Sequence, residues 1–350
     1  MANEIEKLNT IEITDIEKVN TLSDDDIEKI NTFEFAGFTP PAWGRSRAVI
    51  AGGGDNNVSN DLVRIQYKTV GATANTVNFG DLQSKRGNHA CAGSNITLGI
   101  FGGGGGRTNG SAISGVKDID YVTIGTESNG TDFGDMHAYR NYGGKCGASN
   151  GTLLFSCGGW DGITERVLER LDTMEYLTIG TSGSGSNAGE LDVEQSGVNA
   201  TNGNNRYIVN GGYSEAGAIQ MMTYNDFSTS ANVTDFGNMS AAASGNASVC
   251  AASRVVFHVP NNNENRMEYA NPASPSYMTT DFGNLTNPRS SATGTSDGTT
   301  GEWYGGNDNV GGGHFSINYI DKITIASTSD SSDIGDLLET NRSPGSTSGV

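Results

Sequence analysis

The sequence predicts an all-β protein, a six-bladed β-propeller preceded by a short N-terminal arm. Three observations lead to this prediction: a glycine-rich composition, a strand motif that returns in six copies, and a C-terminal segment that supplies a strand missing from the first copy. Glycine makes up 50 of the 350 residues, whereas 35% are hydrophobic and 17% are charged. Because glycine, serine, threonine and asparagine weaken helix interiors, an all-helical fold is not expected.

The arm, residues 1–42, differs from the rest because it holds ten acidic and three basic residues and almost no glycine. An Ile-Glu-Lys-apolar-Asn-Thr unit begins at Ile5, Ile16 and Ile27, a period of eleven residues. Apolar residues at three-residue steps behind Ser23, Asp24 and Asp25, which are plausible N-caps, favour a short helix that ends at Asn-Thr. Two alternatives stay open: a right-handed supercoil with identical chains and a disordered acidic tail.

The repeated apolar residues of the arm are candidates for a docking strip that binds partner proteins. They are Ile5, Leu8, Ile16, Val19, Ile27, Ile30 and Phe33. Thr39-Pro40-Pro41 ends the arm, because proline holds the residue before it extended. The sequence therefore predicts two parts, a docking arm over residues 1–42 and a propeller over residues 43–350.

In the body, a strand centred on tyrosine returns at steps of 54, 55, 48, 45 and 53 residues. A period near 50 residues is typical of β-propellers. The strand alternates with period two, as in residues 118–126. The central residues are Tyr67, Tyr121, Tyr176, Tyr224 and Tyr269, with Lys322 in the sixth copy.

Two further markers accompany the tyrosine strand. A glycine pair or run precedes it in every copy but the fifth, which has Val259-Pro260-Asn261. An Asp/Asn-Phe-Gly-Asp/Asn turn follows it, with Ile334 for phenylalanine in the sixth copy and Ala188-Gly189-Glu190 in the third. The phenylalanines are Phe79, Phe133, Phe236 and Phe282. Glycine supplies a positive φ in such a turn, and we expect the phenylalanine to anchor the packing of its blade.

A segment of small residues after each turn suits the innermost strand of a blade. The body starts without this strand, at residues 47–50, and the chain ends with it, at residues 342–349. We therefore expect the last residues to complete the first blade, which removes a free sheet edge. Cys91, Cys146 and Cys250 share one position in this segment and are expected to be small buried side chains. With Cys157 as the fourth cysteine, no disulfide framework is expected.

The charge balance limits the possible partners. The chain has 21 basic and 40 acidic residues, a net charge of −19, and no basic segment that could pair with phosphates, so nucleic acid is not an expected partner. No apolar run reaches the roughly 18 residues of a membrane span, and the N-terminus lacks a basic and then apolar leader. We expect a soluble chain made in a cytoplasm, which a particle released by lysis could carry outside the cell.

A glycine pair followed by a tyrosine strand resembles the Kelch-type repeat, over about residues 43–350. The Kelch tryptophan after the tyrosine is missing, and the phenylalanine of the turn takes its packing role. The body is more similar to the Kelch-like repeat proteins of tailed bacteriophages, especially marine ones, at residues 121–126, 132–135 and Arg140. That family also carries repeats like the one at residues 27–31. The resemblance implies a virion structural protein of the tail or fibres.

Enzyme classes that use similar motifs lack their other residues here. The glycine run at 102–106 is not followed by Gly-Lys-Ser/Thr, as a phosphate loop requires. Asp-Phe-Gly at 132–134 recurs through the body, which indicates architecture rather than a kinase. The histidines occupy unequal repeat positions, against a copper oxidase, and no Ser-x-Asp-x-Gly-x-Thr-Trp box of a sialidase is present.

Three groups of residues remain candidates for binding. Arginines follow the turn in four copies and are expected to bond to the neighbouring blade rather than an anion: Arg86, Arg140, Arg289 and Arg342. Turn aspartates that could hold calcium are Asp81, Asp135 and Asp336, although no calcium-loop pattern supports them. The tryptophans, which could stack on sugar rings or cap the propeller, are Trp43, Trp160 and Trp303.

Together these features lead us to expect a non-catalytic virion structural protein, associated with the tail, neck or fibre and present in several copies per particle. Residues 1–42 would bind other virion proteins, and no catalytic residue, cofactor or metal is expected. One alternative is a module that binds a host-surface glycan through loops on one face of the propeller. A further alternative is a propeller hydrolase or oxidase.

Overall fold

The computed structural model describes most of the body and seven short strands of the arm. The described parts of the body are residues 46–55, 61–88, 91–108, 111–141, 147–161, 169–261, 264–308 and 315–348. The chain divides into two units, Met1–Gly44 and Arg45–Val350. Over the described residues, no helix is both long enough and apolar enough to cross a membrane.

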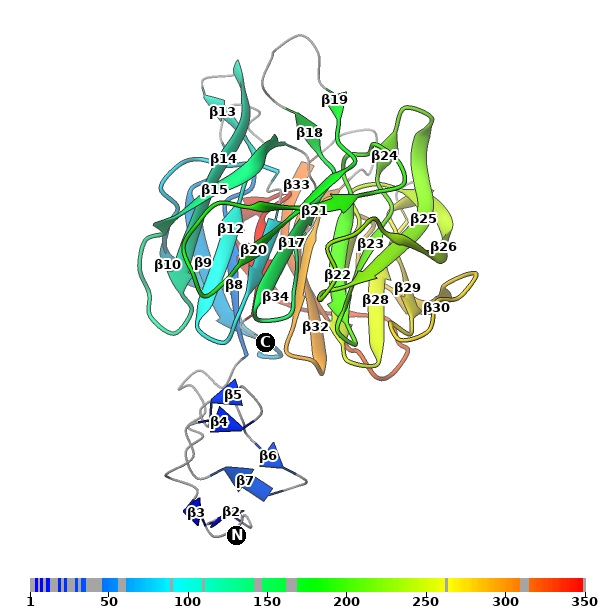
Figure 1. The fold of residues 1–350 in the computed structure, drawn as a ribbon. Coiled ribbons are helices and arrows are strands. Elements are labelled where there is room, and N and C mark those ends of the chain that lie inside the picture. The colour runs from blue at the N-terminus through cyan, green and yellow to red at the C-terminus, as the bar shows by residue number, and fades with distance from the viewer. Residues whose placement is uncertain are drawn as a thin grey trace. The chain divides into compact units, whose positions relative to one another are not determined.

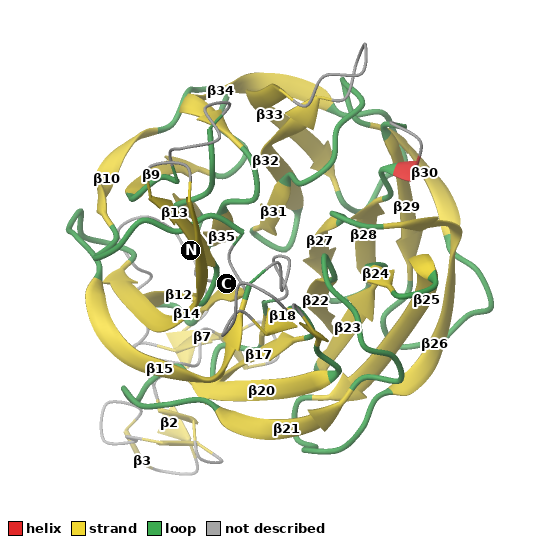
Figure 2. Cartoon of the chain, turned by 90° about the horizontal axis from the view of Figure 1, so that it is seen from above, coloured by secondary structure: helices red, strands yellow, loops and turns green. Residues whose placement is uncertain are grey.

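The second unit is an all-β, six-bladed propeller whose blades are antiparallel sheets arranged around a central axis (Figures 1 and 2). From the inner to the outer strand, blade 1 is β35 (Gly345–Thr347), β8 (Arg47–Ala51), β9 (Arg64–Thr69) and β10 (Val77–Asp81). Blade 2 is β11 (Cys91–Ser94), β12 (Leu98–Gly102), β14 (Ser111–Thr123) and β15 (Thr131–Arg140). Blade 3 is β16 (Ala148–Ser149), β17 (Leu153–Cys157), β20 (Thr173–Thr178) and β21 (Ser186–Glu190).

The other three blades repeat this order. Blade 4 is β22 (Asn199–Gly203), β23 (Arg206–Asn210), β25 (Gly217–Asp226) and β26 (Thr234–Ala243). Blade 5 is β27 (Ala247–Ala251), β28 (Arg254–His258), β29 (Arg266–Ala270) and β30 (Thr280–Asn284). Blade 6 is β31 (Thr293–Ser296), β32 (Thr300–Asp308), β33 (Phe315–Thr324) and β34 (Ser332–Asn341). Short extra strands are β13 (Gly105–Thr108), β18 (Trp160–Asp161), β19 (Glu169–Arg170) and β24 (Tyr213–Ser214).

The ring closes through the C-terminal strand, as predicted. β35 pairs antiparallel with β8, and the register places Ser346 opposite Ile50 and Thr347 opposite Val49. Blade 1 is therefore built from both ends of the propeller sequence. This pairing leaves no free inner edge on β8.

The inner strands are made of small residues because they lie side by side around the axis. A Cβ added to Gly93 would lie 2.6 Å from a methyl carbon of Leu154 in blade 3. Hydroxyl groups join the neighbouring strands: Thr347 Oγ1 donates to Ser94 Oγ at 2.6 Å, and Ser348 Oγ donates to the Ser296 carbonyl oxygen at 2.5 Å. Larger side chains at these positions would push the blades apart.

Within the blades, the repeat tyrosine and the turn phenylalanine pack edge to face. The ring centroids are 5.7 Å apart for Tyr67–Phe79, 6.0 Å for Tyr121–Phe133, 5.7 Å for Tyr224–Phe236 and 6.1 Å for Tyr269–Phe282. All four phenylalanines are buried. Blade 3 lacks the turn phenylalanine, and there the ring centroid of Tyr176 lies 5.8 Å from that of Phe155 instead.

The glycine of the Phe-Gly turn is the point where the next blade docks. Gly134 has φ +139°, and a Cβ there would lie 2.5 Å from the Gly183 carbonyl oxygen of blade 3. On either side of it, Gly183 N donates to the Phe133 carbonyl at 2.9 Å and Gly185 N donates to the Asp135 carbonyl at 2.8 Å. Equivalent close approaches occur at Gly189, Gly237, Gly283 and Gly335. The turn motif is therefore a clasp between blades.

The arginine after the turn also joins two blades. The Arg140 side chain is buried, and its Nε donates to Glu175 Oε1 of blade 3 at 2.6 Å. Its Nη1 donates to the carbonyl oxygens of Gly158 and Thr173 at 2.5 and 2.9 Å. Equivalent ion pairs are Arg86–Asp120 at 2.8 Å and Arg289–Asp321 at 3.1 Å, whereas Arg342 instead forms a backbone bridge with Gly54.

A second set of arginines, which the sequence analysis did not single out, stacks on the repeat tyrosines. Arg47 lies 4.4 Å from the ring centroid of Tyr67, Arg206 lies 4.6 Å from Tyr224, and Arg254 lies 4.3 Å from Tyr269. Each also donates to a backbone carbonyl of the following blade, as Arg47 Nη1 does to Ile124 at 3.1 Å. The signal was present, because an arginine opens the second strand in these three blades.

In the arm, each eleven-residue unit contains a pair of short antiparallel strands. β2 (Lys7–Leu8) pairs with β3 (Ile11–Glu12), β4 (Lys18–Val19) with β5 (Leu22–Ser23), and β6 (Lys29–Ile30) with β7 (Phe33–Phe35). In addition, β1 (Glu4–Ile5) pairs parallel with β7. The helix and supercoil interpretations are wrong for these residues. Apolar residues three apart, such as Leu8 and Ile11, lie opposite each other across two intervening residues, which is the spacing of a β-hairpin.

The cysteines differ partly from expectation. Cys91 is a free, buried thiol whose pKa burial raises to about 12, and Cys250 is free and half-buried. Cys157 is disulfide-bonded, although the sequence led us to expect no disulfide framework. The fourth cysteine, Cys146, lies outside the described residues.

Candidate functional site

The face of the propeller drawn uppermost in Figure 1 carries the short strands β13, β18, β19 and β24. A cleft of about 620 Å³ opens there between blades 3 and 4. It is lined by Glu169, Arg170, Val193, Glu194, Ser214, Glu215 and Ala216. We call this the blade 3/4 cleft.

Two pairs of strands, β18 with β19 and β24 with β25, carry most of the cleft lining, whereas Val193 and Glu194 lie in the connection from β21 to β22. β18 pairs with β19 and places Trp160 opposite Arg170, while β24 pairs with β25 and places Tyr213 opposite Ala218. The backbone of Trp160 exchanges two hydrogen bonds with Asn141 of blade 2, at 2.6 and 3.0 Å. The backbone of Tyr213 does the same with Ser196, at 2.7 and 3.1 Å. Both aromatic residues are therefore held in place by backbone on two sides.

The Arg170 guanidinium lies against two aromatic rings from different blades. Its central carbon is 4.5 Å from the ring centroid of Trp160 and 5.4 Å from that of Tyr213, within the range of cation–π contacts. Among the described residues, its buried Nε has no hydrogen-bond partner. The rings thus restrict the orientation of a planar donor group whose Nε is shielded from solvent.

Acidic and apolar side chains surround this arginine. Glu169, Glu194 and Glu215 are all exposed, and Val193 is 39% exposed. Tyr213 is 46% exposed; it precedes Ser214 of the cleft lining and lies beside Arg170. The blade 3/4 cleft therefore combines one guanidinium with three acceptor-only carboxylates, and the exposed Tyr213 lies beside them. Such a set is suited to bind a ligand that carries both apolar C–H surface and several hydroxyls.

A second cavity, of about 420 Å³, lies on the axis at the opposite ends of the strands. Its lining comes from the inner strands of all six blades and consists mostly of glycine, alanine, serine, threonine and asparagine. Several of its hydroxyls already bond to neighbouring blades, as those of Thr347 and Ser348 do. This central cavity follows from the packing of the inner strands.

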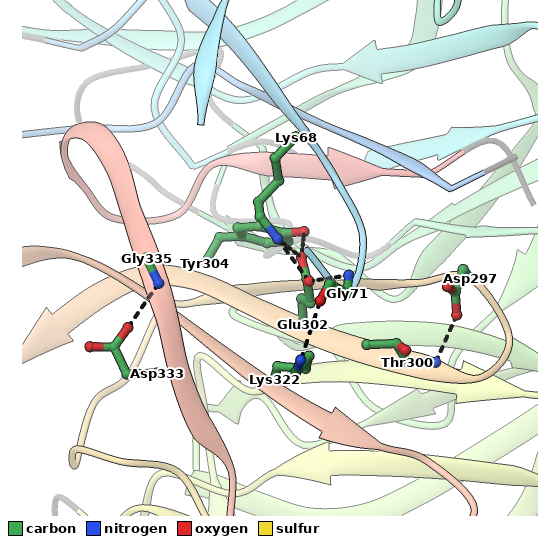
Figure 3. Close-up of polar contacts among 9 residues, drawn as sticks. All are labelled: Lys68, Gly71, Asp297, Thr300, Glu302, Tyr304, Lys322, Asp333 and Gly335. Carbon is green, nitrogen blue, oxygen red and sulfur yellow. Dashed lines mark hydrogen bonds and ion pairs between the residues drawn. The ribbon is translucent and has the colours of Figure 1, made fainter. Parts of the chain in front are cut away.

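The interface between blades 6 and 1 holds a buried ionic cluster (Figure 3). Lys68 Nζ donates to both oxygens of Glu302, and the same carboxylate accepts hydrogen bonds from the backbone N of Gly71 at 2.6 Å and from the Tyr304 hydroxyl. Burial lowers the pKa of Lys68. Because Glu302 is 0% exposed and already has these four hydrogen bonds, the cluster is closed to a ligand and acts between the blades.

The structure separates the tryptophans that the sequence grouped together. Trp303 is fully buried in blade 6, Trp160 lies beside the blade 3/4 cleft, and Trp43 is outside the described residues. Tyr213, an exposed residue beside the cleft, was missed. A signal for it exists in the sequence, because Tyr213 follows a glycine pair just as Trp160 does in the preceding blade.

The other candidate residues do not assemble a site in the body. Asp81, Asp135 and Asp336 lie in separate blades, each at the clasp with the next blade. Over the part of the chain that the structure describes, no three His, Cys, Asp or Glu side chains gather where they could hold a metal ion. In the arm, Ile5, Leu8, Val19, Ile30 and Phe33 lie in the short strands, whereas Ile16 and Ile27 are outside the described residues.

Comparison with known proteins gives no further guide: no protein-family model matches the sequence, and no curated protein matches it.

Proposed function

We propose that the protein is a non-catalytic structural component of a tailed-phage particle, in the tail, neck or fibre. Residues 1–42 attach it to other virion proteins, and the propeller is the part that is displayed. The observation that carries this proposal is that the repeated charged residues join the blades to one another. Arg86, Arg140, Asp120 and Glu175 are buried in contacts between blades, where they maintain the ring. The resemblance of the repeats to phage Kelch-like proteins is the reason for proposing a phage particle.

The arm supports attachment because its hairpins are too small to be stable alone. Isolated two-stranded hairpins are marginally stable in water, and the strands here are two or three residues long. A partner surface that covers their apolar residues would stabilise them. Three copies of one unit provide three equivalent contacts, which raises the overall affinity for a repeated partner.

The test is to complement a phage that lacks this protein with a chain from which residues 1–42 are removed. We expect the truncated chain to fold but to be missing from purified particles by immunoblot. A sharper variant replaces Leu8, Val19 and Ile30 by asparagine, and its control replaces Lys7, Lys18 and Lys29 by glutamine. The asparagine variant should be excluded from particles and the glutamine variant retained. Normal incorporation of the truncated chain would contradict the attachment role, and immunogold labelling of wild-type particles would locate the protein.

The blade 3/4 cleft favours a second candidate function, recognition of a glycan on the host surface. The specific observation is the exposed Tyr213 ring beside Arg170 and three exposed glutamates. Binding of the purified protein to an array of bacterial surface glycans tests this function, and it does so independently of particle assembly.

A further inference from the structure

We propose that the blade 3/4 cleft binds a neutral pyranose residue, with the sugar ring on Tyr213 and two adjacent hydroxyls between Arg170 and the glutamates Glu194 and Glu215. The inference rests on the second candidate function, glycan recognition, and assigns it a site and a sugar class. It follows from the exposed Tyr213 beside the cleft, from the donor and acceptor groups of the lining, and from their charge.

The aromatic surface is provided by Tyr213 rather than by Trp160. Tyr213 is 46% exposed, whereas Trp160 is half-buried and has the Arg170 guanidinium 4.5 Å from its ring centroid. A pyranose presents a face of C–H groups that packs on an aromatic ring, while the tyrosine hydroxyl stays in water. The 39% exposed Val193 extends the apolar surface at the edge of the cleft.

The polar groups match the hydroxyls of a sugar. Each hydroxyl both donates and accepts a hydrogen bond, so a pair of adjacent hydroxyls is best satisfied by a donor group beside an acceptor group. The Arg170 guanidinium contacts the rings of Trp160 and Tyr213, and because its Nε is buried, its terminal Nη groups are the donors for a ligand. Because the two rings already restrict its side chain, a ligand orders it at little entropic cost.

The charge of the cleft selects against acidic sugars. Arg170 contributes one positive charge, and Glu169, Glu194 and Glu215 contribute three negative charges, a local balance of 1 − 3 = −2. The whole chain has a net charge of −19. A sialic or uronic acid would bring a further carboxylate into this field, and like charges oppose its binding. A neutral sugar has no such penalty.

The axial cavity is a weaker candidate for the same ligand. No aromatic side chain lines it, and hydroxyls such as that of Thr347 already bond to a neighbouring blade. The blade 3/4 cleft has a guanidinium and carboxylates in its lining, and the exposed Tyr213 lies beside its Arg170.

The experiment uses the purified full-length chain on an array of immobilised oligosaccharides of glucose, galactose, mannose and N-acetylglucosamine, with sialylated and polyuronate glycans beside them. The neutral oligosaccharide that binds best is then titrated by calorimetry against wild type and variants. We expect Tyr213→Ala to weaken binding at least tenfold and Tyr213→Phe to keep it within threefold. The matched control is Tyr277→Ala, which removes an 87% exposed tyrosine from blade 5 and should leave binding unchanged.

A double variant, Glu194→Gln with Glu215→Gln, tests the charge argument. Its signal on the polyuronate and sialylated spots should rise relative to the neutral ones, because two of the three carboxylates are gone. Near-UV circular dichroism checks that each variant keeps the native fold. Wild-type preference for acidic glycans would overturn the sugar class. Neutral-glycan binding that survives Tyr213→Ala would overturn the site but leave glycan recognition standing, and no binding to any glycan would overturn both.

Discussion

The Lys68 ammonium of blade 1 donates to both carboxylate oxygens of Glu302 in blade 6, at 2.8 and 2.9 Å, and both side chains are almost completely buried. Lys68 follows the repeat tyrosine, a position that the other copies fill with Val122, Leu177, Asn225, Ala270 and Ile323. The ion pair therefore marks the interface where the ends of the ring meet. Because a buried charge needs its partner, this pair favours blade 6 closing on blade 1 over other pairings of similar blades.

Replacing Lys68 by methionine should lower the free energy of unfolding by about 3–5 kcal/mol, because it leaves the Glu302 carboxylate buried without its cation. The double variant Lys68→Met with Glu302→Gln should recover most of that loss. The glutamine amide oxygen can still accept the hydrogen bond from Gly71 N, and its NH₂ group, in place of the other carboxylate oxygen, can donate to the Tyr304 hydroxyl oxygen. Urea unfolding of the three proteins measures both effects. A single variant as stable as wild type would show that the pair does not stabilise the closure.

Deleting Gly345–Val350 should destabilise the whole propeller by several kcal/mol, since blade 1 loses its inner strand β35. Ser346 and Ser348 also donate to backbone carbonyls of blade 6, at 3.1 and 2.5 Å. Thermal melting detects the change as a lower midpoint. Deleting only residues 349–350 is the control, which keeps all of β35. Equal midpoints for both deletions would contradict closure by β35.

Replacing Gly134 by alanine should disrupt the clasp between blades 2 and 3. An alanine at φ +139° is strained, by about 1–3 kcal/mol, and its Cβ would lie 2.5 Å from the Gly183 carbonyl oxygen. The matched control is Gly180→Ala, in the same loop as Gly183, where an added Cβ has no atom within 4 Å. Chemical denaturation should show a loss of stability for Gly134→Ala and none for Gly180→Ala. Comparable losses of stability in both variants would mean that the propeller tolerates no substitution in this region, and that the contact between Gly134 and Gly183 has no special role.

Much of the propeller was predictable because each blade repeats the same strand order and the same contacts between neighbouring strands. The Tyr121–Phe133 contact joins residues of neighbouring strands in one blade, so sequence spacing alone places them together. The closure by residues 345–347 followed from counting strands at the two ends. The arm was misread because apolar residues three apart fit both a helix face and the opposite sides of a short hairpin.

The blade 3/4 cleft could not be predicted with the same ease. Arg170 and Tyr213 come from different blades, and each lies outside the repeat motif that guided the sequence analysis. Lys68 and Glu302 are separated by 234 residues and depart from the pattern of the other blades. Contacts made by such irregular residues depend on how neighbouring blades pack, and a single-blade pattern contains no information about that packing.

Stability should fall above pH 10 partly because of Tyr207, a buried tyrosine whose ring stacks on Phe155 at 4.5 Å between centroids. Burial raises the pKa of Tyr207 well above its ordinary value of 10.0. The folded chain therefore keeps this proton while the unfolded chain releases it, so stability is full below pH 10 and declines as pH rises through that value. The decline is about 1.4 kcal/mol per pH unit for one such group.

Tyr207→Phe keeps the stacked ring and removes the titrating hydroxyl. Between pH 8 and pH 11, its free energy of unfolding should fall by about 1.4 kcal/mol less than that of wild type, because one raised pKa is gone. Burial also raises the pKa of Tyr304, so the free energy of unfolding of both proteins still declines with pH through that residue. Urea unfolding at several pH values gives the two curves. Parallel curves would mean that Tyr207 ionises equally easily in the folded and unfolded chains, and burial in blade 4 would then not hold its proton.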